Sequence, residues 1–211
     1  DALKRMKPTC IEDIVALVAL YRPGPMENIP TYCEVKNGLK ERESVHPLID
    51  HILEETQGII VYQEQVMQIS KKMGNFSSAD AGVLRKAISK KNVDMMGKMF
   101  VEFKEGALSN GVEEKTVQTI WDNWLEFANY AFNKSHAACY ALISFQTAYL
   151  KAHFPVEFMA ALLTVEEDPA KIPYFIEECK NILTTEAIIK PIKAIKSKEP
   201  KPVRSFFVVK P

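Results

Sequence analysis

The stretch EKTVQTIWDNWLEFANYA, residues 114–131, places apolar side chains three and four residues apart. This spacing gives a helix one apolar face and leaves polar side chains on its other faces. The pattern therefore predicts an amphipathic helix that packs against a core. Its apolar positions are Val117, Ile120, Trp121, Trp124, Leu125 and Ala128.

Helical periodicity extends outward from this stretch over most of the chain. Glycine, proline and asparagine pairs, such as Gly74-Asn75 and Phe154-Pro155, separate the periodic segments. Only Gly58 to Tyr62 reads as a strand, so we expect a mainly α fold with at most one short β element. The other helices are expected at residues 11–21, 47–55, 63–73, 78–89, 92–109, 135–152, 155–165 and 169–181.

Composition indicates a globular chain, with 47% hydrophobic and 26% charged residues in 211. No apolar run reaches the roughly 18 residues of a membrane span, and the charged start does not resemble a secretion signal. The four cysteines are scattered and form no zinc-binding motif, so we expect reduced, mostly packed thiols and a cytoplasmic location.

Charge is unevenly distributed although the net charge is zero. Residues 183–211 carry seven Lys/Arg against two Glu, which leaves 20 Lys/Arg and 25 Asp/Glu in residues 1–182. The last segment is rich in lysine and proline and has no long period, so we expect a domain over 1–182 followed by a linker or tail. Domains that hold duplex DNA alone are usually basic, so a nucleic-acid role would rest on local patches.

The most informative candidate site is the segment from Phe132 to Tyr140. Asn133 or Ser135 can cap a new helix, whose free N–H groups and positive dipole end would lie beside Lys134 and His136. Such a helix start suits phosphate, and Tyr140, one turn beyond His136, could lie against a base or sugar. Spacing alone equally fits a capped core helix with a surface lysine and a buried tyrosine.

Two further segments are candidates. Arg85, Lys86, Lys90 and Lys91 place four cations within seven residues, which is either a solvated face or a means of neutralising several phosphate oxygens. Tyr62, Gln63 and Glu64 lie at a strand-to-helix junction, where the Glu64 carboxylate favours the helix start and can orient the basic residues. No Asp-x-Asp pair offers the neighbouring carboxylates of a two-metal site, so we expect no metal site and no catalysis by this chain alone.

Four stretches follow one another along the chain: Ile14 to Pro25, Gly58 to Met67, Leu84 to Lys91, and Phe132 to Pro155. In order and spacing they resemble the fingers of the α subunit of bacterial DNA polymerase III, a C-family replicative polymerase. The resemblance covers residues 3–182 and implies a DNA-directed DNA polymerase whose fingers close over the incoming deoxynucleoside triphosphate (dNTP) and primer-template DNA. Asn129 and Ala131 stand where the family often has glycine, and the continuation beyond Ile182 is not that of the family.

The resemblance also implies roles for individual residues. Triphosphate contacts would come from Arg85, Lys86, Lys90, Asn133, Lys134 and His136. Tyr140 would shape the base and sugar pocket, and Tyr62, Gln63 and Glu64 would support these residues. Mg²⁺ would be held by the palm, and the partners would be the palm and thumb of the same polypeptide and other replisome subunits, with no membrane.

Two other functions stay open at this point. A non-catalytic helical module could bind single-stranded nucleic acid through the same cations and aromatic rings, although the excess of acidic residues in 1–182 opposes strong autonomous binding. A helical interaction scaffold would explain the amphipathic helices but not the four ordered stretches.

Overall fold

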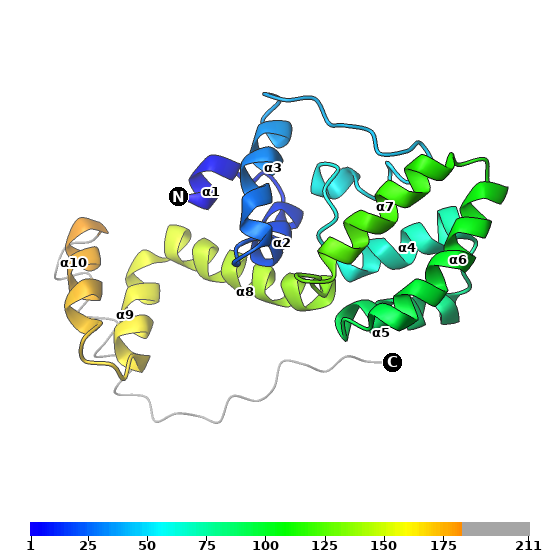
Figure 1. Ribbon diagram of the computed structural model, residues 1–211. Helices are drawn as coiled ribbons and strands as arrows, with labels where there is room; N and C mark the ends of the chain where they lie inside the picture. Colours follow the sequence, from blue (N-terminus) through cyan, green and yellow to red (C-terminus); the bar gives the residue numbers. More distant parts are fainter. Residues whose placement is uncertain (183–211) are drawn as a thin grey trace, which may run out of the picture. The chain divides into compact units, whose positions relative to one another are not determined.

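The computed structural model describes residues 1–182, and the tail expected over residues 183–211 lies outside the described residues. The regular structure of residues 1–182 is helical, and their one β contact is an isolated parallel bridge between Tyr62 and Phe132 (Figure 1). The mainly α prediction is confirmed. The helices are α1 (Ala2–Met6), α2 (Ile11–Leu20), η1 (Pro25–Asn28), α3 (Ile29–Lys36), η2 (Glu54–Thr56), α4 (Gln63–Gly74), α5 (Ser78–Ser89), α6 (Val93–Ser109), α7 (Glu114–Phe127), α8 (Lys134–His153), α9 (Pro155–Val165) and α10 (Ile172–Ile182).

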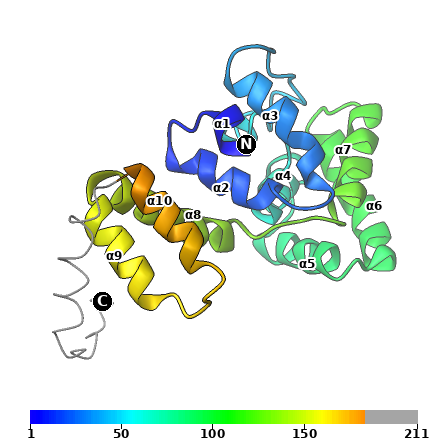
Figure 2. The same ribbon diagram turned by 90° about the vertical axis from the view of Figure 1, so that its left-hand side faces the viewer.

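The chain divides into two compact units, Asp1–Ile143 and Ser144–Pro211, with the boundary inside α8. In the first unit, α4 packs against α5 and α6, and α6 packs against α7. In the second, α9 and α10 lie side by side, as both ribbon views show (Figures 1 and 2).

The larger core of the first unit lies among α4, α5, α6 and α7. At its centre the Phe103 ring lies 4.7 Å from Trp124 and 5.5 Å from Trp121, centroid to centroid. The amphipathic prediction for residues 114–131 is confirmed for the buried face, although Leu125 is exposed and the helix ends at Phe127 in a turn closed by the Tyr130 N–H. Burial of these large aromatic side chains stabilises this core.

A second core joins α1, α2 and α3 to the start of α8. Tyr62, Ala137 and Ala141 are buried in it. Neither α1 nor α3 was predicted from the sequence. The proline-rich stretch after α2 does end that helix, but Pro25 and Pro30 then stand in the first turns of η1 and α3, where the missing N–H costs no hydrogen bond.

The prediction of a helix at residues 47–55 is wrong, because turns occupy residues 47–52 and only the short η2 follows. The carboxylate of Asp50 accepts the N–H groups of Val45 and His46 at 3.0 and 3.1 Å, which competes with helix formation. The strand predicted at 58–62 reduces to the bridge of Tyr62, since Val61 and Tyr62 instead donate their N–H groups to Gln65 Oε1 at 2.9 and 3.0 Å.

Two further expectations concern the cysteines and membrane spans. The cysteines are free, but only Cys33 and Cys179 are buried, so the packing expected of the thiols is wrong for Cys10 and Cys139. Within residues 1–182, every helix falls short of the length or apolarity needed to cross a membrane.

Candidate phosphate-binding site

Two helix starts lie side by side at the centre of the candidate site. The parallel bridge aligns Tyr62, just before α4, with Phe132, just before Asn133 and α8, and the N–H of Gln63 donates to the carbonyl of Phe132 at 2.9 Å. Gln65, which is buried, donates from Nε2 to Thr56 Oγ1 at 2.7 Å and so fixes the preceding loop against α4. A backbone hydrogen bond and the buried side chain of Gln65 therefore both contribute to the position of the two helix starts.

Glu64 of α4 binds the start of α8. Its Oε1 accepts Asn133 Nδ2 at 2.6 Å, and its Oε2 accepts the backbone N–H of Lys134 at 3.0 Å. Asn133 caps the helix, since its Oδ1 accepts the N–H of His136 at 2.9 Å. Of the two caps expected, Asn133 and Ser135, the structure has Asn133. The expectation of free N–H groups is wrong for Lys134 and His136, because a carboxylate and an amide oxygen already accept them.

The side chain of Lys134 is also held by a carboxylate. Its Nζ lies 2.6 and 2.7 Å from the two oxygens of Glu55, in the middle of η2, and 5.5 Å from the centre of the Tyr62 ring. Desolvation raises the pKa of Tyr62, which is buried, so its ring stays neutral beneath the ammonium group. Glu55 is a contact of the site that no sequence pattern indicated.

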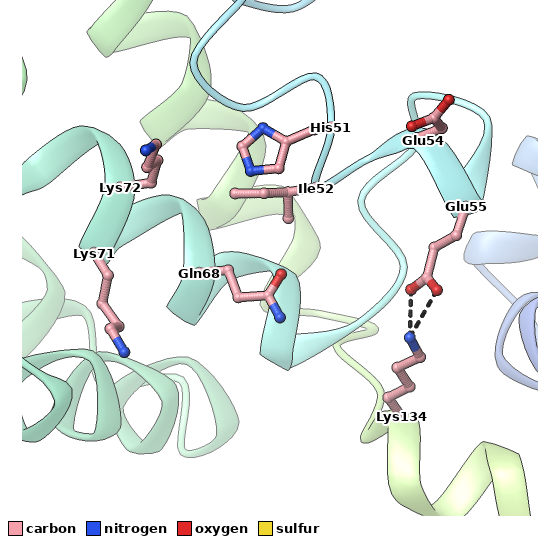
Figure 3. A pocket seen from close by; sticks show the side chains of 8 residues that line it. All are labelled: His51, Ile52, Glu54, Glu55, Gln68, Lys71, Lys72 and Lys134. Carbon is pink, nitrogen blue, oxygen red and sulfur yellow. Dashed lines mark hydrogen bonds and ion pairs between the residues drawn. The ribbon is translucent and has the colours of Figure 1, made fainter.

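Lys134 and Glu55 line an open hollow of about 700 Å³ between η2, α4 and the start of α8 (Figure 3). Lys71 and Lys72 of α4 and His51 line it as well, and Figure 3 shows Lys71 and Lys72 on the side away from the ion pair. Glu54 also lines the hollow, with its carboxylate turned away from Lys134. The hollow therefore presents several cations, of which Lys134 is neutralised by a carboxylate.

The basic cluster of α5 is connected to the same place through Gln63. Its Nε2 donates to Ser89 Oγ at 3.1 Å, and Ser89 Oγ donates to the carbonyl of Arg85 at 2.9 Å. Lys86 and Lys90 are exposed and Arg85 is half-buried. Within residues 1–182, no ion pair engages these three cations, in contrast to Lys134. The first turn of α4 thus contacts both predicted clusters, α5 through Gln63 and α8 through Glu64.

His136 and Tyr140 project from the start of α8 into solvent. Their ring centroids lie 4.8 Å apart, and His136 also contacts Phe132 at 5.5 Å. Tyr140 is 55% exposed, so it is not a core tyrosine. An exposed aromatic ring one helical turn from a polar cap is available for stacking against a planar ligand.

Arg22, which follows α2, contacts the segment before α8. Its Nη2 donates to the carbonyl of Tyr130 at 2.7 Å, and its guanidinium lies 4.3 Å from the centre of the Phe132 ring. Burial lowers its pKa from the ordinary arginine value, but the group remains a cation. The sequence around Arg22 gave no sign of this long-range contact.

The profile of the bacterial DNA polymerase III alpha subunit finger domain matches residues 1–111. The chain belongs to this finger-domain family. It is 49% identical over 181 residues to the DNA polymerase III subunit alpha of Borreliella burgdorferi and 48% identical over 179 residues to that of Halalkalibacterium halodurans. These alignments cover 85% and 84% of this chain and 16% of each relative.

The subunit alpha of Mycobacterium tuberculosis is 45% identical over 189 residues, which cover 86% of this chain and again 16% of the relative. The finger-domain chain therefore spans about a sixth of the length of the curated relatives it matches. Segments equivalent to both clusters fall within the long alignments, since these extend over most of residues 1–182.

Proposed function

We propose that this chain is the fingers region, residues 1–182, of a DNA-directed DNA polymerase and that it binds the triphosphate of the incoming dNTP. The observation that carries this proposal is the first turn of α4, where Gln63 contacts α5 and Glu64 contacts α8. A triphosphate needs several cations held at fixed separations. The residues proposed to supply its contacts are Arg85, Lys86, Lys90, Asn133, Lys134 and His136.

The aromatic rings extend this proposal to the nucleoside. Tyr140 is exposed one turn along α8 from His136, so it is placed to contact the base or sugar of a nucleotide whose phosphates lie at the helix start. The Tyr62 ring contacts the ammonium group of Lys134. Gln63 is hydrogen-bonded to α5 and Glu64 to the start of α8, so we propose that they fix the two clusters relative to each other. Closure of such a helical region on a correct base pair would couple selection to catalysis.

The remaining parts of the polymerase reaction are proposed to lie in the rest of the polypeptide. Among residues 1–182, no three His, Cys, Asp or Glu side chains come together as ligands of a metal ion. We propose that carboxylates of the palm would hold Mg²⁺, which would neutralise the transferring phosphates there. The proposed partners are primer-template DNA, the palm and thumb and other replisome subunits in the cytoplasm, and this region alone would be inactive.

Replacing the proposed triphosphate contacts tests this function. In the full-length enzyme, Lys134→Ala and Arg85→Ala are each expected to raise KM for dNTP about 10-fold, which corresponds to about 1.4 kcal/mol of lost binding. Loss of one charge-assisted contact has this magnitude. Steady-state extension of a primed template with varied dNTP measures it.

Lys115→Ala is the matched control, because Lys115 is exposed on α7 and lies in neither cluster. It is expected to leave KM within about twofold of the wild-type value, as for other surface substitutions. If Lys134→Ala and Arg85→Ala behave like Lys115→Ala, the proposed triphosphate site is wrong.

A further inference from the structure

The ion pair between Lys134 and Glu55 differs from the other contacts of the site, because another anion can replace its carboxylate. The side chains of Lys134 and Glu55 are 40% and 34% exposed, and both border the open hollow of Figure 3. Partly exposed ion pairs contribute only about 0–1 kcal/mol, because water and salt screen them. A competing anion that enters the hollow can therefore replace the Glu55 carboxylate at little cost.

Glu64 is not exchangeable in the same way. It accepts the N–H of Lys134 and the amide of Asn133, and Asn133 in turn caps α8. Moving the Glu64 carboxylate away would leave the Lys134 N–H and the Asn133 amide without their acceptor. Moving the Glu55 carboxylate away frees only the ammonium group of Lys134. The two carboxylates at Lys134 therefore have separate roles, one holding the helix and one neutralising the side chain.

We propose that Glu55 is a resident counter-ion of Lys134 that the phosphate chain of the nucleotide displaces, so that Glu55 sets the affinity for nucleotide. This inference rests on the proposed function. In the free protein Glu55 neutralises Lys134 above the Tyr62 ring, and on binding a phosphate oxygen takes the place of the carboxylate. The exchange is non-covalent, and Glu55 acts on the affinity for nucleotide through Lys134.

The lining of the hollow favours phosphate as the displacing anion. Lys71 and Lys72 line it together with Lys134, and within residues 1–182 no ion pair engages either of them. Lys71 Nζ donates to the neutral Ser78 Oγ at 3.1 Å. A phosphate chain that displaces Glu55 thus meets further cations in the same hollow, whereas a single carboxylate ligand could engage only one end of it.

Replacement of Glu55 by glutamine tests this role in the full-length enzyme. Glu55→Gln keeps the shape of the side chain but removes the charge that competes with phosphate. We expect KM for dNTP to fall about threefold to fivefold, which is the fold-change equivalent of an exposed ion pair. Inorganic tripolyphosphate, used as a competitive inhibitor, is expected to show a Ki lowered by the same factor.

Two further variants make the test specific. Glu54 lines the same hollow but forms no ion pair with Lys134. The KM of Glu54→Gln for dNTP is therefore expected to stay within about twofold of the wild-type value. In a Lys134→Ala background, Glu55→Gln is expected to have no effect, because its action passes through the lysine.

The outcomes separate this inference from the proposed function. If Lys134→Ala raises KM while Glu55→Gln leaves KM unchanged or raises it, the counter-ion role is overturned and the triphosphate site stands. An equal fall in KM for Glu54→Gln also overturns the counter-ion role, since loss of any negative charge from the hollow would then have the same effect. If Lys134→Ala itself leaves KM unchanged, the proposed function fails and the inference fails with it.

Discussion

Gly106→Ala is expected to lower the free energy of unfolding by about 3 kcal/mol or more. A Cβ atom at Gly106 would overlap the backbone carbonyl of Gly74, and a Cβ atom at Gly74 would overlap the Phe103 ring. The obstacle at Gly106 is backbone, so no side-chain rotation can relieve it, and α4 and α6 would have to separate. Separation would loosen the packing of the core around Phe103.

Gly97→Ala provides the control on the same helix. Apart from its chain neighbours and the nearby backbone of its own helix, no atom lies within 4 Å of a Cβ built at Gly97, and this residue is inside α6. Alanine favours helix over glycine by about 0.5–1 kcal/mol, so Gly97→Ala is expected to stabilise the fold. Urea unfolding followed by circular dichroism measures both variants, and similar midpoints for the two would contradict the close-contact argument.

Sequence periodicity predicted most of the helical framework correctly. The helices of the larger core repeat apolar residues over several turns, and within residues 1–182 those of α4 to α9 agree with the predicted ranges to within a few residues. The helix α3 was missed because its stabilisation comes from packing in the second core and its sequence begins among prolines. The helix expected at 47–55 failed because Asp50 caps turns there, a local contact that periodicity does not register.

Part of the candidate site was also predictable from the sequence. Asn133 and the cations of α5 are local features, so the sequence indicated both segments before their contacts were known. The partner of Lys134 was not predictable, because Glu55 lies 79 residues away and belongs to the three-residue η2, which is too short to show periodicity. Contact between Gln63 and Ser89 likewise depends on how α4 packs against α5, which no spacing along one helix determines.

Asp13→Asn is expected to lower the free energy of unfolding at pH 7 by about 3 kcal/mol, because it removes one partner of a buried ion pair. Asp13 Oδ2 lies 2.8 Å from Lys36 Nζ, and the two side chains are only 4% and 10% exposed. The same oxygen accepts the N–H of Thr9 at 2.8 Å. The Tyr32 hydroxyl lies between Asp13 Oδ1 at 3.3 Å and the carbonyl of Glu55 at 3.4 Å, so this cluster also supports the loop that carries Glu55.

Controls for Asp13→Asn come from the exposed pair of Lys40 and Glu43 and from a double variant. Glu43→Gln is expected to leave the free energy of unfolding nearly unchanged, since that pair is open to solvent. Asp13→Asn combined with Lys36→Met is expected to cost less than the sum of the single changes, because the buried ammonium no longer lacks a partner. Strict additivity would show that the two side chains do not interact in the folded chain.

The acid dependence of stability provides an independent measurement of the same carboxylate. Burial alone would raise the pKa of Asp13, but hydrogen bonds from Lys36, Thr9 and Cys10 lower it from 3.8 to about 2. The pKa is depressed in the folded state, so the stabilisation is fully present above pH 3.8 and is lost as the pH falls towards 2. The loss amounts to about 2 kcal/mol. Urea midpoints between pH 5 and pH 2 are therefore expected to fall less steeply in Asp13→Asn than in the wild-type chain, and parallel curves would assign the acid sensitivity to other carboxylates.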